Sequence, residues 1–173
     1  MNTHNWLRLI HIVIGVFWVG TAVFLATILI PAMRSVGPSA GVVMRELMAN
    51  RKMPTVLMTA AIVTILSGSV LAWRDAGALG FRWFESGAGL GFGLGAIAGI
   101  SALLTGVTVT MPTGKKMNAL MAQVQAQGRA PNEQEAAQMR TLQDRLFAAS
   151  RVTALLLVIA TGFMATARNF GAS

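Results

Sequence analysis

Two histidines near the N-terminus are the side chains of this chain best suited to chemistry. His4 and His11 are seven residues apart, so they share one face of a helix. Arg8, Gly15 and Trp18 continue that face towards the middle of a long apolar segment. A neutral imidazole can ligate haem iron or copper, which makes His11 the candidate ligand.

The face around His11 has a functional and a structural interpretation. As a cofactor site it would bind haem b or copper through His11, with Gly15 leaving room for a flat macrocycle. Arg8 and Trp18 would complete the cofactor-binding face, and His4 is a candidate metal ligand that also fits a solvated residue at the membrane interface. As a structural feature, His11 would hydrogen-bond a hydroxyl or carbonyl of a neighbouring helix. The residues leave both interpretations open.

Other kinds of chemistry have little support in the sequence. There is no cysteine, which excludes disulfides, thiolate metal sites and cysteine nucleophiles. The eleven methionines offer soft thioether ligands for Cu(I), but methionine also fills gaps between apolar helices. The six acidic residues all lie outside the long apolar segments, so no carboxylate proton relay is indicated. No candidate catalytic set emerges.

Four long apolar segments must position these residues. A transmembrane helix needs roughly 20 largely apolar residues to cross about 30 Å of hydrocarbon. Only 12% of the residues are charged, against about 25% in soluble domains, and they are concentrated between these segments. We therefore predict an all-α protein, a four-helix transmembrane bundle forming a single membrane domain over residues 1–173. The predicted helices are 6–30, 54–73, 87–111 and 146–167, with connections at 31–53 and 112–145.

The distribution of Lys and Arg predicts the orientation. Basic residues gather in the connections 31–53 and 112–145, which should therefore face the cytoplasm. Both termini are then periplasmic, in a bacterial inner membrane. The net charge of +8 fits this rule and contact with anionic lipid, so nucleic acid is not an expected partner. Both connections also carry apolar residues at near-helical spacing, and residues 132–145 are predicted to extend the fourth helix.

The two halves of the chain resemble each other. In each half, the first apolar segment ends in a proline that is followed three residues later by a basic residue. The second apolar segment of each half has a hydroxyl residue and a glycine, with an arginine six residues after the glycine. These pairs are Pro31 with Arg34, Pro112 with Lys115, Ser67-Gly68 with Arg74, and Thr161-Gly162 with Arg168. They predict two tandem parallel helical hairpins related by a pseudo-two-fold axis along the membrane normal.

Glycines dominate the third segment. Gly91, Gly95 and Gly99 are four residues apart, the small-xxx-small pattern that lets helices approach closely. The pattern favours tight helix packing. A slot for a cofactor ring or lipid tail, and a dimer seam, are the alternatives.

The first segment also resembles a known group of membrane proteins. The residues Trp6-x-Arg8-x-x-His11-Ile12, then Trp18-x-Gly20 and a proline at the far end, resemble the first helix of the CopD-like (copper resistance protein D) family. They are similar, more distantly, to the HemJ-type protoporphyrinogen oxidases. The resemblance implies a small helical bundle that binds haem b or copper in its outer half.

The chain departs from both groups. HemJ-type proteins pair the histidine with a lysine of a later helix, but Lys52, Lys115 and Lys116 are predicted on the opposite side of the membrane, which argues against oxidase activity. CopD-like proteins often carry further histidines, and none follows His11. A second axial haem ligand would have to be His4, a methionine, or the His11 of a second protomer.

Two functional hypotheses follow from these observations. The first is a CopD-like membrane protein that binds haem b or copper through His11 and acts in electron transfer or metal handling. The second is a non-catalytic structural or accessory subunit of a larger respiratory or photosynthetic membrane complex. Membrane lipids are expected partners under both hypotheses. Assembly into a homodimer or a larger membrane complex is also compatible with both.

Overall fold

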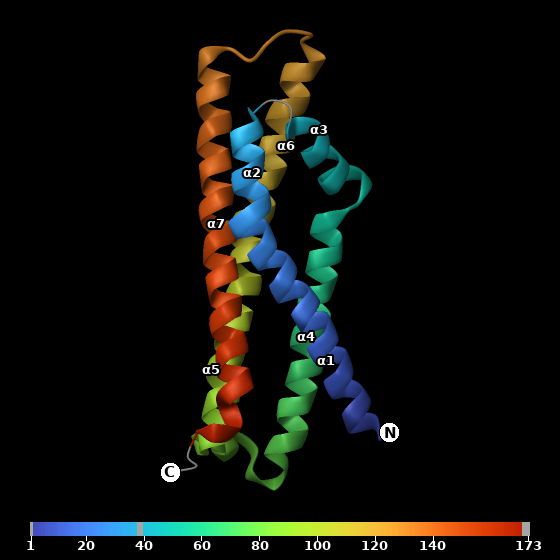
Figure 1. Ribbon diagram of the computed structural model, residues 1–173, viewed down its shortest axis with the longest axis vertical. Helices are drawn as coiled ribbons and strands as arrows, with labels where there is room; N and C mark the ends of the chain where they lie inside the picture. The colour runs from blue at the N-terminus through green and yellow to red at the C-terminus, as the bar shows by residue number, and fades with distance from the viewer. Residues whose placement is uncertain (1, 38–39, 171–173) are drawn as a thin grey trace.

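The chain is built almost entirely from helices. The computed structural model describes residues 2–37 and 40–170, and within these ranges it contains no β-strand. Four helices are long and apolar enough to cross a membrane (Figure 1). The predicted all-α fold with four apolar spans is therefore confirmed. Residues 38–39 of the predicted connection 31–53, and residues 1 and 171–173 of the predicted domain, lie outside the described residues.

The first long helix continues beyond its predicted end. α1 (Thr3–Phe24) begins at Asn2, whose side chain accepts a hydrogen bond from the Asn5 amide at 3.0 Å. A π-helical turn at Leu25–Leu29 follows, and then α2 (Ile30–Val36). Pro31 has no N–H to donate and its ring crowds the preceding turn, and the wider π turn accommodates both defects. The helix therefore continues past Pro31 into the predicted connection 31–53, where apolar residues recur at near-helical spacing.

The third long helix has the same construction. α5 (Gly87–Thr105) leads into a π-helical turn at Gly106–Thr110 and then into α6 (Met111–Ala126), whose second residue is Pro112. The predicted connection 112–145 is therefore mostly helical. Both π turns end two residues before the proline of their own helix, so the two helices share the same local register.

A short helical connection leads from the first to the second long helix. α3 (Ala40–Arg45) and a π-helical turn at Glu46–Asn50 precede α4 (Met53–Ala76). Lys52, the residue before α4, has a positive φ of 48°, which is uncommon for a residue other than glycine. A 3₁₀-helical stretch at Gly77–Glu85 then joins α4 to α5.

α7 (Glu133–Thr166) is the longest α-helix without a π turn, and a short 3₁₀ turn at Ala167–Asn169 follows it. Its N-terminus has a capping box, in which the side chains of Asn132 and Glu135 each accept the other residue's backbone N–H at 2.8 Å. Its 34 residues span about 51 Å at about 1.5 Å per residue, more than the hydrocarbon of a bilayer. α7 is thus longer than a membrane crossing requires, and it includes most of the segment 132–145 that was predicted to extend the fourth helix.

α6 and α7 form a helical hairpin that projects from one end of the molecule. Met117 and Leu120 of α6 pack on Leu142 of α7 in a small apolar cluster. At its tip, Arg129 donates two hydrogen bonds of 2.8 Å to the Glu135 carboxylate. The guanidinium lowers the pKa of Glu135, and the carboxylate raises the pKa of Arg129.

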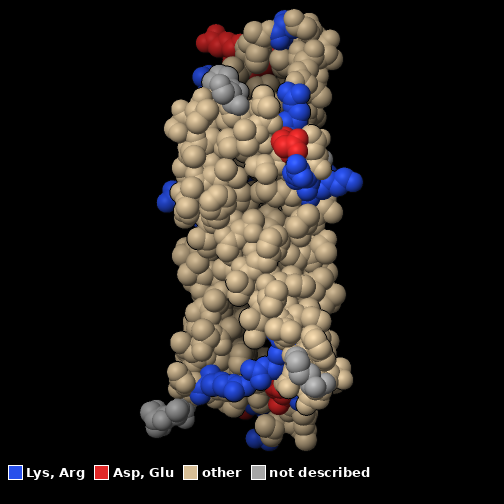
Figure 2. Space-filling model, turned by 45° about the vertical axis from the view of Figure 1, so that its right-hand side comes forward, with Lys and Arg blue, Asp and Glu red and all other residues tan. Residues whose placement is uncertain are grey.

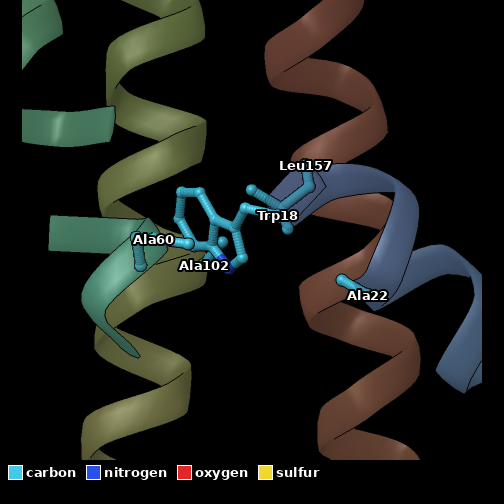
Figure 3. Packing of buried hydrophobic residues seen from close by; sticks show 6 residues of the cluster. Trp18, Ala22, Ala60, Ala102 and Leu157 are labelled. Atoms are coloured by element: carbon cyan, nitrogen blue, oxygen red, sulfur yellow. The ribbon is translucent and has the colours of Figure 1, made fainter. Parts of the chain in front are cut away.

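The core lies where all four long helices meet. α1 packs mainly on α4 and α5 mainly on α7, while α1 also contacts α7. Trp18 is only 6% exposed and packs against Ala60, Ala102 and Leu157, one from each of the other three helices (Figure 3). The predicted close packing of α5 is also present, because a Cβ atom on Gly91 would lie 2.7 Å from the Ala167 Cα.

Charged residues occupy the two ends of the molecule. Figure 2 shows a broad central band without Lys, Arg, Asp or Glu on the face it presents. Large apolar side chains are exposed on all four long helices, as expected where lipid replaces water. One end, called the basic end below, carries most of the positive charge: Arg34, Arg45, Arg51, Lys52, Lys115, Lys116, Arg129, Arg140, Arg145 and Arg151.

Candidate functional site

His11 is held between α1 and α4 by two hydrogen bonds. Its Nδ1 lies 2.8 Å from the backbone oxygen of Thr64 and 3.2 Å from the Ser67 hydroxyl oxygen. Ser67 is itself buried and donates to the Val63 carbonyl at 2.6 Å. The sequence predicts such a bond to a neighbouring helix under the structural interpretation of His11, and the structure supplies the partners.

Glycine at position 68 creates the space that the imidazole occupies. A Cβ atom there would lie 2.7 Å from the His11 Cε1 and 3.2 Å from its Nδ1. Since carbon atoms normally pack about 3.5–4.0 Å apart, even a methyl group would displace the ring. Ser67 and Gly68 thus belong to the His11 site. The sequence had marked this pair only as a sign of duplication.

The hydrogen bond to Thr64 sets the state of the neutral imidazole. A backbone carbonyl can only accept, so Nδ1 carries the proton and Nε2 keeps its lone pair. Within the described part of the chain Nε2 has no hydrogen-bond partner, and it is not fully enclosed. An imidazole oriented through Nδ1 with a free Nε2 is the arrangement in which histidine ligates a metal.

The space beside Gly15, which was expected to leave room for a flat macrocycle, is occupied. Thr64 fills it, because a Cβ on Gly15 would lie 3.4 Å from the Thr64 Cγ2. The Thr64 hydroxyl is buried and has no hydrogen-bond partner among residues 2–37 and 40–170. Such an orphan group is unusual and marks a place where water or another polar atom would be accommodated. A macrocycle therefore has no space on the Gly15 side of His11.

The other three predicted site residues are spread along α1. Trp18 is part of the core and forms no wall of an open site. Arg8 is exposed, because the buried side of α1 runs through Leu7 and Ile14 and leaves Arg8 at its edge. His4 lies at the start of α1, with its Nε2 4.0 Å from the Asp75 carboxylate of α4. The structure thus brings together His11 and Gly15, but neither Arg8 nor His4 joins them.

The ligand set for copper is incomplete. The described residues contain no group of three His, Cys, Asp or Glu side chains able to hold a metal ion. His4 and His11 are separated by about 10 Å along α1, given a rise of about 1.5 Å per residue, so they cannot share one ion. These residues fit a single axial bond to haem better than a copper centre.

Comparisons with protein-family models, with curated proteins and with solved structures found no match to this chain.

Proposed function

We propose that this chain is a multi-pass protein of the bacterial inner membrane that ligates haem b through Nε2 of His11 and serves electron transfer. The observation that carries the proposal is the orientation of His11, with Nδ1 bound to the Thr64 carbonyl at 2.8 Å and Nε2 without a partner among residues 2–37 and 40–170. A polar atom left unpaired within an apolar segment is costly, and an iron bond would remove that cost. The resemblance to CopD-like proteins supports the same assignment.

The chain's own contribution would be to fix and isolate the ligand. Thr64 and Ser67 hold the imidazole in one orientation, and Gly68 lets it lie against α4. The haem would supply one-electron redox chemistry at this position. Thr64 fills the space on the Gly15 side of His11, so a haem would have to be accommodated elsewhere around the imidazole. Any further ligand would come from outside this set of residues, such as the His11 of a second protomer. Copper is not proposed, because the described residues bring together no three His, Cys, Asp or Glu side chains.

A second candidate function is an accessory subunit of a larger membrane complex. It is favoured by one observation, namely that Trp18 and Gly15 are both packed against neighbouring helices rather than lining an empty slot. In this case His11 would act as a helix-to-helix clamp. The lipid-exposed apolar faces of the four helices would then be covered partly by partner subunits.

Orientation and internal symmetry belong to the same proposal. The basic end carries ten of the fourteen Lys and Arg residues and four of the six acids, which supports a cytoplasmic location for that end and a periplasmic one for both termini. The two π turns are separated by 81 residues, and so are Pro31 and Pro112. This shared spacing supports duplication of a helical hairpin about a pseudo-two-fold axis along the membrane normal.

The test is an absorption spectrum of the protein purified from cells supplied with a haem precursor. The proposal predicts a Soret band in the wild type that is lost in His11→Ala. The matched control is His4→Ala, which removes a histidine from the same helix and should keep the band. A colourless wild-type protein that co-purifies with a stable partner complex would establish the accessory role instead.

A further inference from the structure

A groove between α1 and α4 opens towards the basic end of the molecule. Ile14 and Phe17 of α1 form one wall, and the first half of α4 forms the other. Its volume is about 500 Å³, within the range of about 300–1,000 Å³ typical of small-molecule sites. The groove exists because α1 leans away from α4 towards α7 as it approaches the basic end (Figure 1).

The lining of the groove changes from basic to apolar along α4. Arg51 and Lys52 are at its mouth, Thr55 and Thr59 follow, and Ala60 and Val63 are at its far end. Lys52 to Val63 covers about 16 Å at about 1.5 Å per residue. That length is about half of a hydrocarbon layer about 30 Å thick, and so matches one leaflet.

One of the two positive charges at the mouth has no acidic partner among the described residues. The Arg51 guanidinium pairs with the Glu46 carboxylate at 3.0 Å. Lys52 is exposed and forms no ion pair within the described part of the chain. Its ammonium group is therefore the cation available to a ligand, at the level where an apolar segment meets the solvent.

From this arrangement we infer a binding site for one anionic phospholipid of the leaflet at the basic end. Its phosphate lies against Lys52, and one acyl chain lies in the groove along α4. The occupant is lipid because the groove faces the apolar surroundings of the bundle along its length. The lipid is anionic because the mouth offers an unpaired ammonium group at the more positive end of the molecule. The site is independent of any cofactor on His11.

The experiment is native mass spectrometry of the detergent-purified protein titrated with phosphatidylglycerol or phosphatidylcholine. The first bound phosphatidylglycerol should be retained more strongly than phosphatidylcholine. Lys52→Asn removes the charge, and asparagine tolerates the positive φ of this position. A basic residue near an anionic phosphate contributes about 1 kcal/mol, so the affinity should fall about fivefold. The control is Lys116→Asn, an exposed lysine at the same end but outside the groove, which should have no effect.

A second pair of variants tests the apolar part of the site. Thr59→Trp places a large side chain in the groove and should abolish the first binding event. Val158→Trp places the same side chain on an exposed face of α7 and should preserve it. Equal retention of the two lipids, or equal effects of Lys52→Asn and Lys116→Asn, would overturn the proposal and leave only general contact with surrounding lipid. Circular dichroism of each variant verifies that the helices are intact.

Discussion

Replacing Gly68 by alanine should disturb the His11 site more sharply than any other single-methyl change in this chain. The added Cβ would lie 2.7 Å from the His11 Cε1, about 1 Å inside normal carbon contact. The imidazole must therefore move away from α4, where its acceptor lies. A hydrogen bond of 2.8 Å to Thr64 would then lengthen beyond about 3.5 Å and be lost.

The expected loss of stability combines two costs and one gain. A hydrogen bond between membrane helices contributes about 0.6–1.7 kcal/mol, and overpacking costs about 1–3 kcal/mol. Against this, alanine is favoured over glycine inside a helix by about 1 kcal/mol in water. Gly68→Ala should therefore lower the free energy of unfolding by about 0.6–3.7 kcal/mol.

The chain provides a matched control for this change. Gly162 follows a hydroxyl residue in α7 as Gly68 does in α4, but a Cβ there would meet nothing within 4 Å. Gly162→Ala should therefore be neutral or stabilising. Both variants gain the same helix propensity, so the difference between them reports the contact with His11. Unfolding in mixed micelles of increasing SDS content, followed by tryptophan fluorescence, gives both free energies.

Two outcomes would contradict a steric contact between residue 68 and the His11 imidazole. One is a Gly68→Ala variant as stable as Gly162→Ala. The other comes from a double-mutant cycle, since Gly68→Ala should cost much less when His11 is already alanine. Additive effects of the two substitutions would show that the imidazole and Gly68 do not interact.

Three further predictions address the helix seam, the projecting hairpin and the orientation. Gly91→Ala should destabilise the protein more than Gly99→Ala. A Cβ atom at position 91 would meet backbone of the 3₁₀ turn after α7, whereas one at position 99 would meet nothing within 4 Å. The same SDS unfolding assay compares the two variants. The Arg129 ion pair lowers the pKa of Glu135, so its contribution is present above the ordinary carboxyl pKa and lost as the pH falls through the lowered one. The difference in proteolysis rate of the hairpin between Glu135→Gln and wild type should therefore vanish on acidification. Lys116→Cys, the only cysteine in that variant, should react with an impermeant thiol reagent in inside-out vesicles but not in intact cells.

Much of the helical architecture could be predicted from the sequence, because apolar runs of this length with at most one charged residue have few alternatives to a membrane helix. The ends of the helices were harder to predict from the sequence. Pro31 and Pro112 were predicted to mark the ends of membrane segments, yet each removes only one backbone donor, and a π turn before it keeps the helix continuous. The helices thus remain continuous because of a π turn before each proline, which cannot be predicted from amino-acid composition.

The candidate site could be predicted only in part. His11 was identifiable as a polar residue in an apolar segment, and a bond to a neighbouring helix was one of its expected roles. Its partners, Thr64 and Ser67, depend on which face of α4 meets α1, and this is decided by packing around Trp18. Arg8 was predicted on the same face of the helix as His11, but it is exposed whereas His11 is half-buried. A rotation of a few tens of degrees around α1 is enough to separate an inward-facing from an outward-facing side chain.

The central claim is that Nε2 of His11 is an iron ligand, and a reduced-minus-oxidised difference spectrum of membranes containing the protein tests it most directly. If His11 ligates haem iron, a b-type α band should increase with the amount of wild-type protein and be absent from His11→Ala membranes. His4→Ala membranes should give the wild-type band. A band of equal size with His11→Ala, or none with wild-type protein in haem-replete cells, would contradict the claim.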